Sequence, residues 1–375
     1  MQTLASLIDY TLKSELSRYY ISILENNNLS TDLADYELLK SLIKAEVIIF
    51  EKFIKSCVEW NILERRNNTL KYISMKDSTV LECKFKEWMC REQMTSFNSE
   101  ESLEEKIKKI KTFLENENII VESNWEYYLV CFLKEILMRI LYSKNLTILL
   151  ETGKCVFNHA FQINGVLPFE SYKKAELLME VFSARFAIQW MSDDLCVLKK
   201  LHLNSSSILD VGGGSGGLAK ALSECSIKPS KYVLLDLKDT SECLTKLRQI
   251  FFESLQTEKT IINYDFFHNI AIQEQFDFIF LSWILHDWSD ENCLLLLSNI
   301  RPLLKKNGKL ILVERCMDSQ RFSKMNFADF LITATAGGVE RTKDEYCSLL
   351  KKVNFSFESI MYVKNSRDFL IFSNK

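Results

Sequence analysis

The chain has 375 residues, which is long enough for two or three domains with sizeable cores. Hydrophobic residues make up 47% and charged residues 26%, as in ordinary soluble globular proteins. The net charge of -3 argues against a nucleic-acid partner, and the lack of any run of 18 or more apolar residues argues against a membrane span.

Residues 1–20 have no basic start followed by a long apolar run, so they do not resemble a signal peptide. The 11 cysteines are scattered, and none forms a CxxC pair or a Cys/His cluster with zinc-site spacing. Reduced thiols of this kind are typical of the cytoplasm. We therefore expect a cytoplasmic protein without a metal site.

Residues 1–95 have the pattern of helices followed by a short hairpin. Apolar residues recur at helical spacing through 37–60. Two short strand-like runs follow, at 61–64 and 70–73, with 65–68 expected as the turn between them. This outline predicts a winged-helix-like region.

Residues 96–200 are expected to form an all-helical connector. The run 102–110 is charged and amphipathic, whereas 125–142 and 176–191 are rich enough in apolar residues to predict buried helices. No linker rich in Pro, Gly or Ser separates these parts, so we expect them to pack together.

From residue 201 the pattern changes to alternating strands and helices. A helix is expected from Ser289, its cap, to about Lys306, ended by Asn307 and Gly308. Another is expected over 218–225. Strands are expected over 208–211, 232–236, 276–281 and 309–314. This α/β alternation predicts a parallel, doubly wound sheet.

Half of the glycines lie in one loop. The chain has 10 glycines, none of them in residues 1–152, and five fall within residues 212–217. The loop leaves a strand at Asp210 and enters a helix, where glycines let the backbone approach a nucleotide-like ligand. The pattern alone fits both a nicotinamide dinucleotide and S-adenosylmethionine.

Two further motifs follow at strand ends. Asp236 lies 19 residues after Gly217, where a carboxylate can accept hydrogen bonds from both hydroxyls of a ribose. Asp265 could accept a bond from an adenine amino group, with Phe266 against the ring. The alternative for Asp236 is a solvated residue at the end of a strand. The alternative for Asp265 is a residue of an ordinary turn.

Residues 281–290 decide between the cofactors. The run LSWILHDWSD resembles the signature of the caffeate and hydroxyindole O-methyltransferases. Three further motifs of that family are matched by Asp265 and Phe266, by residues 307–314 and by the run GGVERT at 337–342. Upstream, Gly153, Phe157 and residues 168–170 fit the same pattern, so the resemblance extends from about residue 40 to the end.

This resemblance implies a class I (Rossmann-like) methyltransferase domain at residues 201–375, with S-adenosyl-L-methionine as its cofactor. It also implies that residues 1–95 form a homodimer and that residues 96–200 line the pocket of a small-molecule substrate. His286 would be the catalytic base, flanked by Glu314 and Glu340. A histidine is suited to take a proton from a phenol near neutral pH.

The glycine loop, the strand ends and the resemblance together predict a set of cofactor-binding residues. They are Asp210, Gly212, Gly214, Gly216, Asp236, Leu237, Asp265, Phe266, Ser282, Asp287 and Trp288.

Several positions depart from the family pattern. Ser282 stands where a lysine is usual, and Lys238 where a proline is usual. The stretches around 186–191 and 321–336 do not match in detail, so the substrate stays open beyond a phenolic or other secondary metabolite. A methyltransferase acting on nitrogen, carbon or sulfur, a non-methylating cyclase-like member and a DNA-binding regulator are the alternatives.

Overall fold

The computed structural model divides the chain into two compact units. Unit 1 comprises Met1–Phe182 and Asn326–Ala336, and unit 2 comprises Ser183–Met325 and Gly337–Lys375. The structure describes residues 20–21, 24, 34–35, 47–59, 63–66, 69–72, 88, 92, 103–117, 149–150, 152, 155, 192–237, 242–268, 270, 272–319, 325–363 and 367–374. The helices expected over 125–142 and 176–191 lie outside these residues.

Unit 1 contains a small antiparallel sheet of order β1-β3-β2, with β1 at Ala34–Asp35, β2 at Leu63–Arg66 and β3 at Thr69–Tyr72. The expected hairpin is confirmed, but the expected turn at 65–68 was too long. Arg65 and Arg66 belong to β2 and pair with Leu70 and Thr69. The strand continues through both arginines because they pair in register with β3, while their side chains stay exposed. The winged-helix interpretation of this region stays a prediction.

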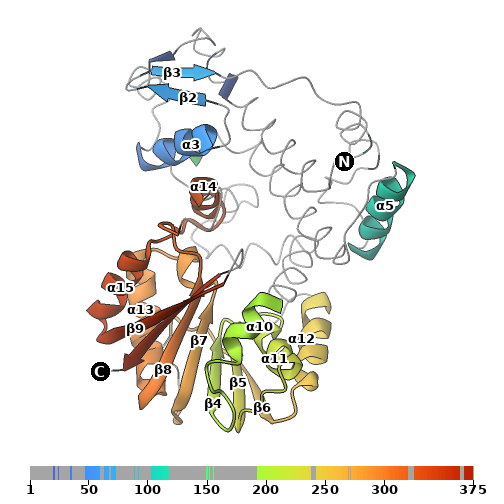
Figure 1. The fold of residues 1–375 in the computed structure, drawn as a ribbon, viewed down its shortest axis with the longest axis vertical. Coiled ribbons are helices and arrows are strands. Elements are labelled where there is room, and N and C mark those ends of the chain that lie inside the picture. The colour runs from blue at the N-terminus through green and yellow to red at the C-terminus, as the bar shows by residue number, and fades with distance from the viewer. Residues whose placement is uncertain are drawn as a thin grey trace. The chain divides into compact units, whose positions relative to one another are not determined.

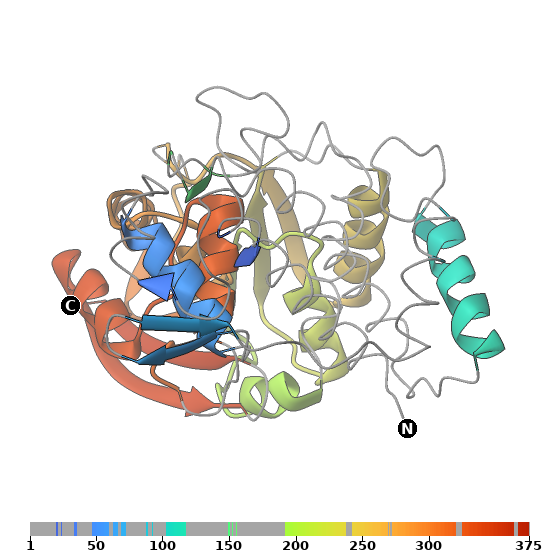
Figure 2. The ribbon, with the colours of Figure 1, turned by 90° about the horizontal axis from the view of Figure 1, so that it is seen from above.

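Two helices of unit 1 that are far apart in the sequence pack together: α3 (Val47–Glu59) and α14 (Met325–Ala336). Figures 1 and 2 show them side by side, and the rings of Phe53 and Phe330 lie 5.8 Å apart. The carboxylate of Glu59 accepts hydrogen bonds from the backbone N–H groups of Asn326 (3.1 Å) and Phe327 (2.9 Å). A residue of α3 therefore caps the first turn of α14, where a negative charge is favoured. A third described helix of this unit, α5 (Leu103–Asn116), confirms the amphipathic segment expected from residue 102.

Unit 2 is built around a seven-stranded sheet of order β6-β5-β4-β7-β8-β10-β9. The strands are β4 (Ser207–Val211), β5 (Lys231–Asp236), β6 (Glu258–Asn263), β7 (Phe276–Ser282), β8 (Leu304–Glu314), β9 (Phe355–Tyr362) and β10 (Asp368–Asn374). The central strands are apolar and buried, as expected for a sheet covered on both faces. The four expected strands are confirmed as β4, β5, β7 and β8.

The four expected strands are parallel, as predicted, but the sheet also has an antiparallel end that was not predicted. The strands β6, β5, β4, β7 and β8 are parallel, but β10 pairs antiparallel with both β8 and β9. Strands β9 and β10 follow each other along the chain with a connection too short for a crossover helix, so they must run in opposite directions.

The helices of unit 2 form two groups. In the first, α11 (Gly217–Glu224) contacts α10 (Ser192–Leu198) and α12 (Glu242–Ser254), and in the second, α13 (Asp290–Ile300) contacts α15 (Lys343–Lys352). Figure 1 shows the first group beside β4–β6 and the second beside β8 and β9. The helix expected over 218–225 is confirmed as α11.

The cap of α13 was predicted correctly, but its end was not. The Ser289 side chain accepts a hydrogen bond from the N–H of Asn292, as expected. The helix ends at Ile300, because Pro302 has no N–H group to continue it, and a 3-10 turn at Arg301–Leu303 leads into β8. Gly308 lies inside β8, where an added Cβ would be 3.0 Å from the carbonyl oxygen of Asp277. Gly308 thus permits a close approach of strands and does not end a helix.

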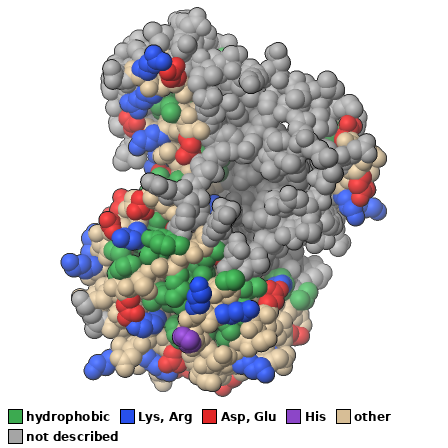
Figure 3. Space-filling model, in the orientation of Figure 1, with side chains coloured by type: hydrophobic (Ala, Val, Ile, Leu, Met, Phe, Trp, Pro, Cys, Tyr) green, Lys and Arg blue, Asp and Glu red, His purple; other side chains and the backbone are tan. Residues whose placement is uncertain are grey.

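Charged side chains of both signs are interspersed on the described surface in view, and no large face of one sign forms there (Figure 3). Among the residues that the structure describes, no helix is long and apolar enough to cross a bilayer. The three-part division into 1–95, 96–200 and 201–375 stays a prediction.

Candidate active site

The predicted site residues of unit 2 converge on one edge of its sheet. Because β4, β5, β6, β7 and β8 are parallel, their carboxyl ends meet at the same edge. Ligands of open α/β sheets bind at this edge. This edge brings together the glycine loop after β4, Asp265 after β6 and the last residues of three strands, namely Asp236 of β5, Ser282 of β7 and Glu314 of β8.

The glycine loop between β4 and α11 turns through backbone conformations that favour glycine. Gly212, Gly214 and Gly216 all have positive φ angles, and Gly216 is the N-cap of α11. A Cβ added at Gly214 would meet no atom within 4 Å, so this part of the loop borders open space. The loop is therefore shaped as the sequence predicts for a ligand-binding turn.

Asp236 is held by the glycine loop that it faces. Its Oδ2 accepts a hydrogen bond from the N–H of Gly214 (2.6 Å), and its Oδ1 accepts one from the N–H of Leu237 (2.7 Å). Arg248 of α12 donates from Nε to the carbonyl of Gly214 (2.6 Å) and places Nη2 3.7 Å from Asp236. Burial raises the pKa of Asp236, while Arg248 and the two N–H groups counteract that rise.

Asp210 lies near the end of β4, just before the glycine loop, and its side chain packs against that loop. It is buried and accepts a hydrogen bond from the hydroxyl of Tyr232. Burial raises its pKa to about 7, against the opposing effect of the Tyr232 bond. A Cβ added at Gly213 would lie 2.6 Å from the Asp210 carboxyl oxygen, so Asp210 supports the loop from below. Its predicted contact with the cofactor stays a prediction.

Three aromatic rings form one wall of the site. Phe266 lies edge-on to Trp288, with ring centroids 6.1 Å apart, and Phe267 lies 4.6 Å from Trp288. Asp265 accepts a bond from the N–H of Phe267 (2.9 Å), which fixes the turn after β6. The structure thus brings together Asp265, Phe266 and Trp288, as predicted, and adds Phe267.

Ser282, where the resemblance predicts a lysine, contacts a buried arginine. Arg367, directly before β10, donates from Nη1 to the Ser282 hydroxyl (2.8 Å) and forms an ion pair with Asp194 of α10. Both side chains of that pair are 1% exposed. A positive charge is therefore present at the carboxyl end of β7, although it comes from another part of the chain.

His286 is enclosed by the two predicted glutamates and Asp287. Its Nδ1 lies 3.0 Å from Glu340 Oε1 and 3.8 Å from Glu314 Oε2, and its Nε2 lies 3.6 Å from Asp287 Oδ1. The imidazole is 4% exposed, and Glu314 is fully buried. The predicted catalytic set is therefore assembled in space from three separate segments.

Glu314 also shapes the turn that carries His286. Its Oε1 accepts hydrogen bonds from the N–H groups of Ile284 (3.1 Å) and Leu285 (2.9 Å), at the start of a 3-10 helix at Leu285–Asp287. Just before them, Trp283 has a φ of 57° and places its ring 5.2 Å from the His286 ring. A bulky residue in this conformation is strained, which is typical of functional sites.

The carboxylates dominate the charge state of His286. Burial lowers its pKa, but Glu340, Asp287 and Glu314 outweigh that effect and raise the pKa to about 10. Burial raises the pKa of Glu314 to about 7, partly opposed by His286. At neutral pH these neighbours favour the protonated form of His286. Among the described residues, no group of three or more His, Cys, Asp and Glu side chains is arranged to hold a metal ion.

Several residues at this edge were not found from the sequence. They are Asp194, Tyr232, Arg248, Phe267, Arg341 and Arg367. Most of these side chains are buried polar groups whose partners lie far away in the chain, and no local pattern indicates such pairs. Arg341 had a signal, since it belongs to the recognised run 337–342, and Phe267 had one as the last residue of the motif that contains Asp265 and Phe266.

The comparison with protein families is consistent with this geometry. The model of the O-methyltransferase domain matches residues 144–356, which is more than half of the chain. The chain belongs to the O-methyltransferase family. The matched residues include the glycine loop, His286 and both glutamates. The part of the chain that identifies the family is therefore the part that forms the site.

Curated members of this family resemble the chain at about 30% identity. O-methyltransferase 12 of Dictyostelium discoideum is 30% identical over 168 residues, covering 44% of this chain and 43% of the relative. Caffeic acid 3-O-methyltransferase 3 of Populus kitakamiensis is 30% identical over 223 residues, covering 56% of this chain and 55% of the relative. Myricetin O-methyltransferase of Catharanthus roseus is 32% identical over 168 residues, covering 40% and 42%. The chain spans about half the length of the curated relatives that it matches.

Solved structures with the same fold are more distant in sequence. Mitomycin 7-O-methyltransferase superposes with a TM-score of 0.55 at 14% identity, covering 99% of this chain and 97% of the other. Human N-acetylserotonin methyltransferase, in complex with S-adenosylmethionine, superposes with a TM-score of 0.53 at 17% identity. The superposition covers 97% of this chain and 94% of the other. These likenesses establish the class I methyltransferase fold predicted from the sequence.

Proposed function

We propose that the chain transfers a methyl group from S-adenosyl-L-methionine to a hydroxyl group of a small molecule, with His286 as the general base. The observation that carries the proposal is the His286 Nδ1 to Glu340 distance of 3.0 Å at the ligand-binding edge of the sheet. Family membership supports methyl transfer to oxygen, and the geometry supports the role of each residue.

The contact with Glu340 decides which nitrogen of His286 accepts the proton. A hydrogen bond from Nδ1–H to a carboxylate fixes the tautomer in which Nε2 has a free lone pair. Among the described residues Nε2 makes no hydrogen bond, since its Asp287 neighbour lies 3.6 Å away. Nε2 can therefore accept the proton of a substrate hydroxyl, while Glu340 stabilises the imidazolium that forms.

The residues at the sheet edge fit the cofactor. The carboxylate of Asp236 has about four acceptor positions and uses two for backbone N–H groups, so two remain for the hydroxyls of a ribose. Phe266 and Trp288 offer apolar ring faces and edges for an adenine, and the glycine loop borders open space. The cofactor supplies an activated methyl group on a positively charged sulfur.

That positive charge also bears on the acid–base state of His286. A general base works best when its pKa lies near the operating pH, and the carboxylates raise the pKa of His286 to about 10. A like charge nearby disfavours the imidazolium and lowers this pKa. Binding of the positively charged cofactor would therefore favour the loss of the extra proton from His286.

The substrate class follows from the relatives. Caffeic acid and myricetin, which appear in the names of two of them, are phenols. A phenol has a pKa near 10 and needs help to lose its proton near neutral pH, which His286 would give. The substrate is therefore a phenolic or other secondary metabolite. The homodimer and the cytoplasmic location stay predictions.

The test combines calorimetry with transfer of a labelled methyl group. S-adenosylhomocysteine is titrated into the wild type, His286→Ala and Asp236→Ala, and each protein is then assayed against a panel of small phenols with methyl-labelled cofactor. We expect Asp236→Ala to bind at least about tenfold more weakly, because a carboxylate bonded to two hydroxyls is lost. We expect His286→Ala to bind normally and to transfer methyl about 10²–10⁴-fold more slowly.

Other outcomes separate the alternatives. A wild type that does not bind S-adenosylhomocysteine contradicts the proposal. Binding without transfer to any phenol would favour a non-methylating member of the fold. Equal transfer rates in His286→Ala and the wild type would contradict the role of His286 alone.

A further inference from the structure

The segment that carries Glu340 also contacts the backbone on both sides of His286. We call residues 338–341 the clamp segment and residues 285–288 the His286 turn. The N–H of Val339 donates a hydrogen bond to the carbonyl of His286 (2.9 Å). A Cβ added at Gly338 would lie 2.0 Å from that same carbonyl oxygen, so the two backbones are in direct contact.

Arg341 of the clamp segment donates hydrogen bonds to the backbone on both sides of His286. Its Nη1 donates to the carbonyl of Leu285 (2.8 Å), and its Nη2 donates to the carbonyl of Trp288 (2.9 Å). These two carbonyls lie directly before and directly after the pair His286 and Asp287. The Arg341 side chain is 4% exposed, so these bonds are shielded from water.

The carbonyls that Arg341 binds have only weak other partners. The carbonyl of Leu285 accepts a bond from the N–H of Trp288 (3.3 Å), and the thiol of Cys293 lies 3.3 Å from it and 3.7 Å from the carbonyl of Trp288. Arg341 adds charge-assisted bonds to both carbonyls, and such bonds are about twice as strong as neutral ones. A guanidinium is planar, carries five donors and stays charged at any relevant pH, so it can serve two carbonyls and a carboxylate together.

We propose that Arg341 is a positioning residue for methyl transfer, because it fixes the His286 turn and so keeps Nδ1 of His286 on Glu340. This inference rests on the proposed function of the site. Arg341 does not touch His286 itself. It acts through the carbonyls of Leu285 and Trp288, while Glu340, its neighbour in the chain, contacts the imidazole.

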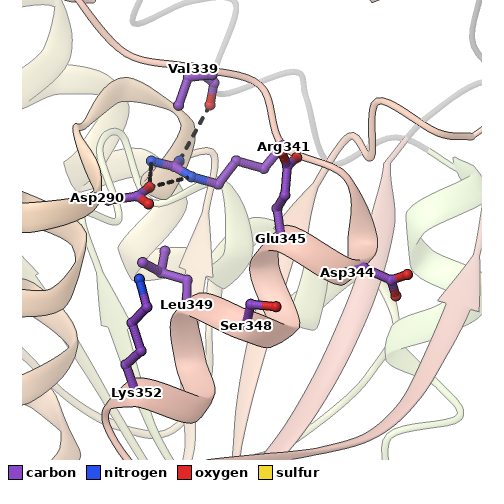
Figure 4. A pocket seen from close by; sticks show the side chains of 8 residues that line it. All are labelled: Asp290, Val339, Arg341, Asp344, Glu345, Ser348, Leu349 and Lys352. Atoms are coloured by element: carbon purple, nitrogen blue, oxygen red, sulfur yellow. Dashed lines mark hydrogen bonds and ion pairs between the residues drawn. The ribbon is translucent and has the colours of Figure 1, made fainter.

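A second set of Arg341 contacts faces outward. Figure 4 shows Arg341 beside Asp290 in a surface hollow of about 430 Å³ between the start of α13 and helix α15. Nη2 and Nε of Arg341 lie 2.8 and 3.0 Å from Asp290 Oδ1. The Asp290 side chain is 55% exposed, so this ion pair contributes little. The inward and outward contacts can therefore be separated by mutation.

The experiment compares Arg341→Met with Asp290→Asn in the full-length chain. Arg341→Met keeps the volume and removes every donor, and we expect kcat to fall about 10–100-fold through misplacement of His286. Affinity for S-adenosylhomocysteine should fall by much less than kcat, because the glycine loop and Asp236 keep their contacts and only Trp288, whose carbonyl Arg341 binds, moves with the turn. Asp290→Asn leaves the carbonyl bonds of Arg341 intact, and its kcat should equal that of the wild type.

A pH profile distinguishes positioning from a merely structural role. Once Glu340 no longer stays against Nδ1, the pKa of His286 falls, because an adjacent carboxylate favours the imidazolium. The acid limb of the kcat profile of Arg341→Met should therefore move to lower pH. A loss of folded protein would scale the whole profile and leave its midpoint in place.

A milder variant covers the case in which Arg341→Met does not fold. Arg341→Lys keeps the charge but presents one ammonium, which cannot reach both carbonyls in the guanidinium geometry. We expect a lowered kcat, a smaller loss of S-adenosylhomocysteine binding and the same shift of the acid limb. An active wild type together with an Arg341 variant of equal kcat and equal pH midpoint overturns the role of Arg341. A wild type that neither binds S-adenosylhomocysteine nor transfers methyl contradicts the proposed function, and with it this role.

Discussion

The two glutamates beside His286 have different tasks. Glu340 is the one within hydrogen-bond distance of the imidazole, at 3.0 Å from Nδ1, whereas Glu314 lies 3.8 Å away. Glu314 uses its other oxygen to accept two backbone N–H bonds at the start of the His286 turn. The charge of Glu340 therefore acts mainly on the imidazole, and that of Glu314 acts largely on the backbone that carries it.

This division predicts the effect of Glu340→Gln on the pH dependence of the reaction. The variant keeps an oxygen that can accept from Nδ1–H but loses the charge that raises the pKa of His286. The rate rises with pH as His286 loses its proton, so a lower pKa moves the acid limb to lower pH. We expect a shift of about one unit or more in the kcat profile.

The matched control is Asp344→Asn, which removes a carboxylate four residues further along the chain. The Asp344 side chain is 84% exposed, so its charge is screened and the acid limb should not move. An unmoved acid limb in Glu340→Gln would contradict the assignment of Glu340 as the dominant partner of His286.

At the scale of elements, one buried ion pair joins three parts of unit 2. Arg367, directly before β10, pairs with Asp194 of α10 and donates to Ser282 at the end of β7. The pair ties a helix that precedes the sheet to the beginning of the antiparallel strand β10. It also fixes Ser282, where the expected lysine is missing.

Removal of one partner should therefore destabilise unit 2. We expect Asp194→Asn to lower the free energy of unfolding by about 3–5 kcal/mol, because it leaves a buried guanidinium uncompensated. The control is Glu274→Gln, which removes the partner of Lys231 at a partly exposed site and should cost less than about 1 kcal/mol. Equal effects of the two changes in urea unfolding would contradict the importance of the buried pair.

The sequence predicted those elements whose signals are local. Strands β4, β5, β7 and β8 are continuous apolar runs, and Ser289 caps α13 with acidic residues behind it. Strand β9 is half exposed and carries no such run, and the antiparallel edge depends on the lack of a crossover helix. The contacts of Arg248, Arg341 and Arg367 depend on folding that brings distant segments together, so no local pattern could reveal them.

The whole molecule consists of two units that the chain does not visit in simple order. It leaves unit 1 after residue 182, returns to it for residues 326–336 and ends in unit 2. The returning piece is α14, which is joined to α3 by the Phe53 and Phe330 rings and by the Glu59 cap. Lys52 strengthens the same contact through an ion pair with Asp329 (2.8 Å).

Two compact units predict two separable unfolding transitions. Phe330→Ala removes a ring that is 1% exposed and should destabilise unit 1 by about 3–5 kcal/mol. Leu222→Ala, in the core of unit 2, should lower the other transition instead. Scanning calorimetry measures both, and a single transition that moves equally in both variants would contradict independent units.

The return of α14 has a consequence for how such proteins can be recombined. An N-terminal segment exchanged between two relatives at residue 182 would bring a foreign α3 against the resident α14. The exchange would succeed only where the incoming segment supplies three side chains: an acidic residue to cap the first turn of α14, a basic residue to pair with Asp329 and an aromatic ring to pack against Phe330. The twelve residues of α14 thus act as a compatibility test for helix α3, whose Ser56 lies 270 residues before Asn326 in the chain.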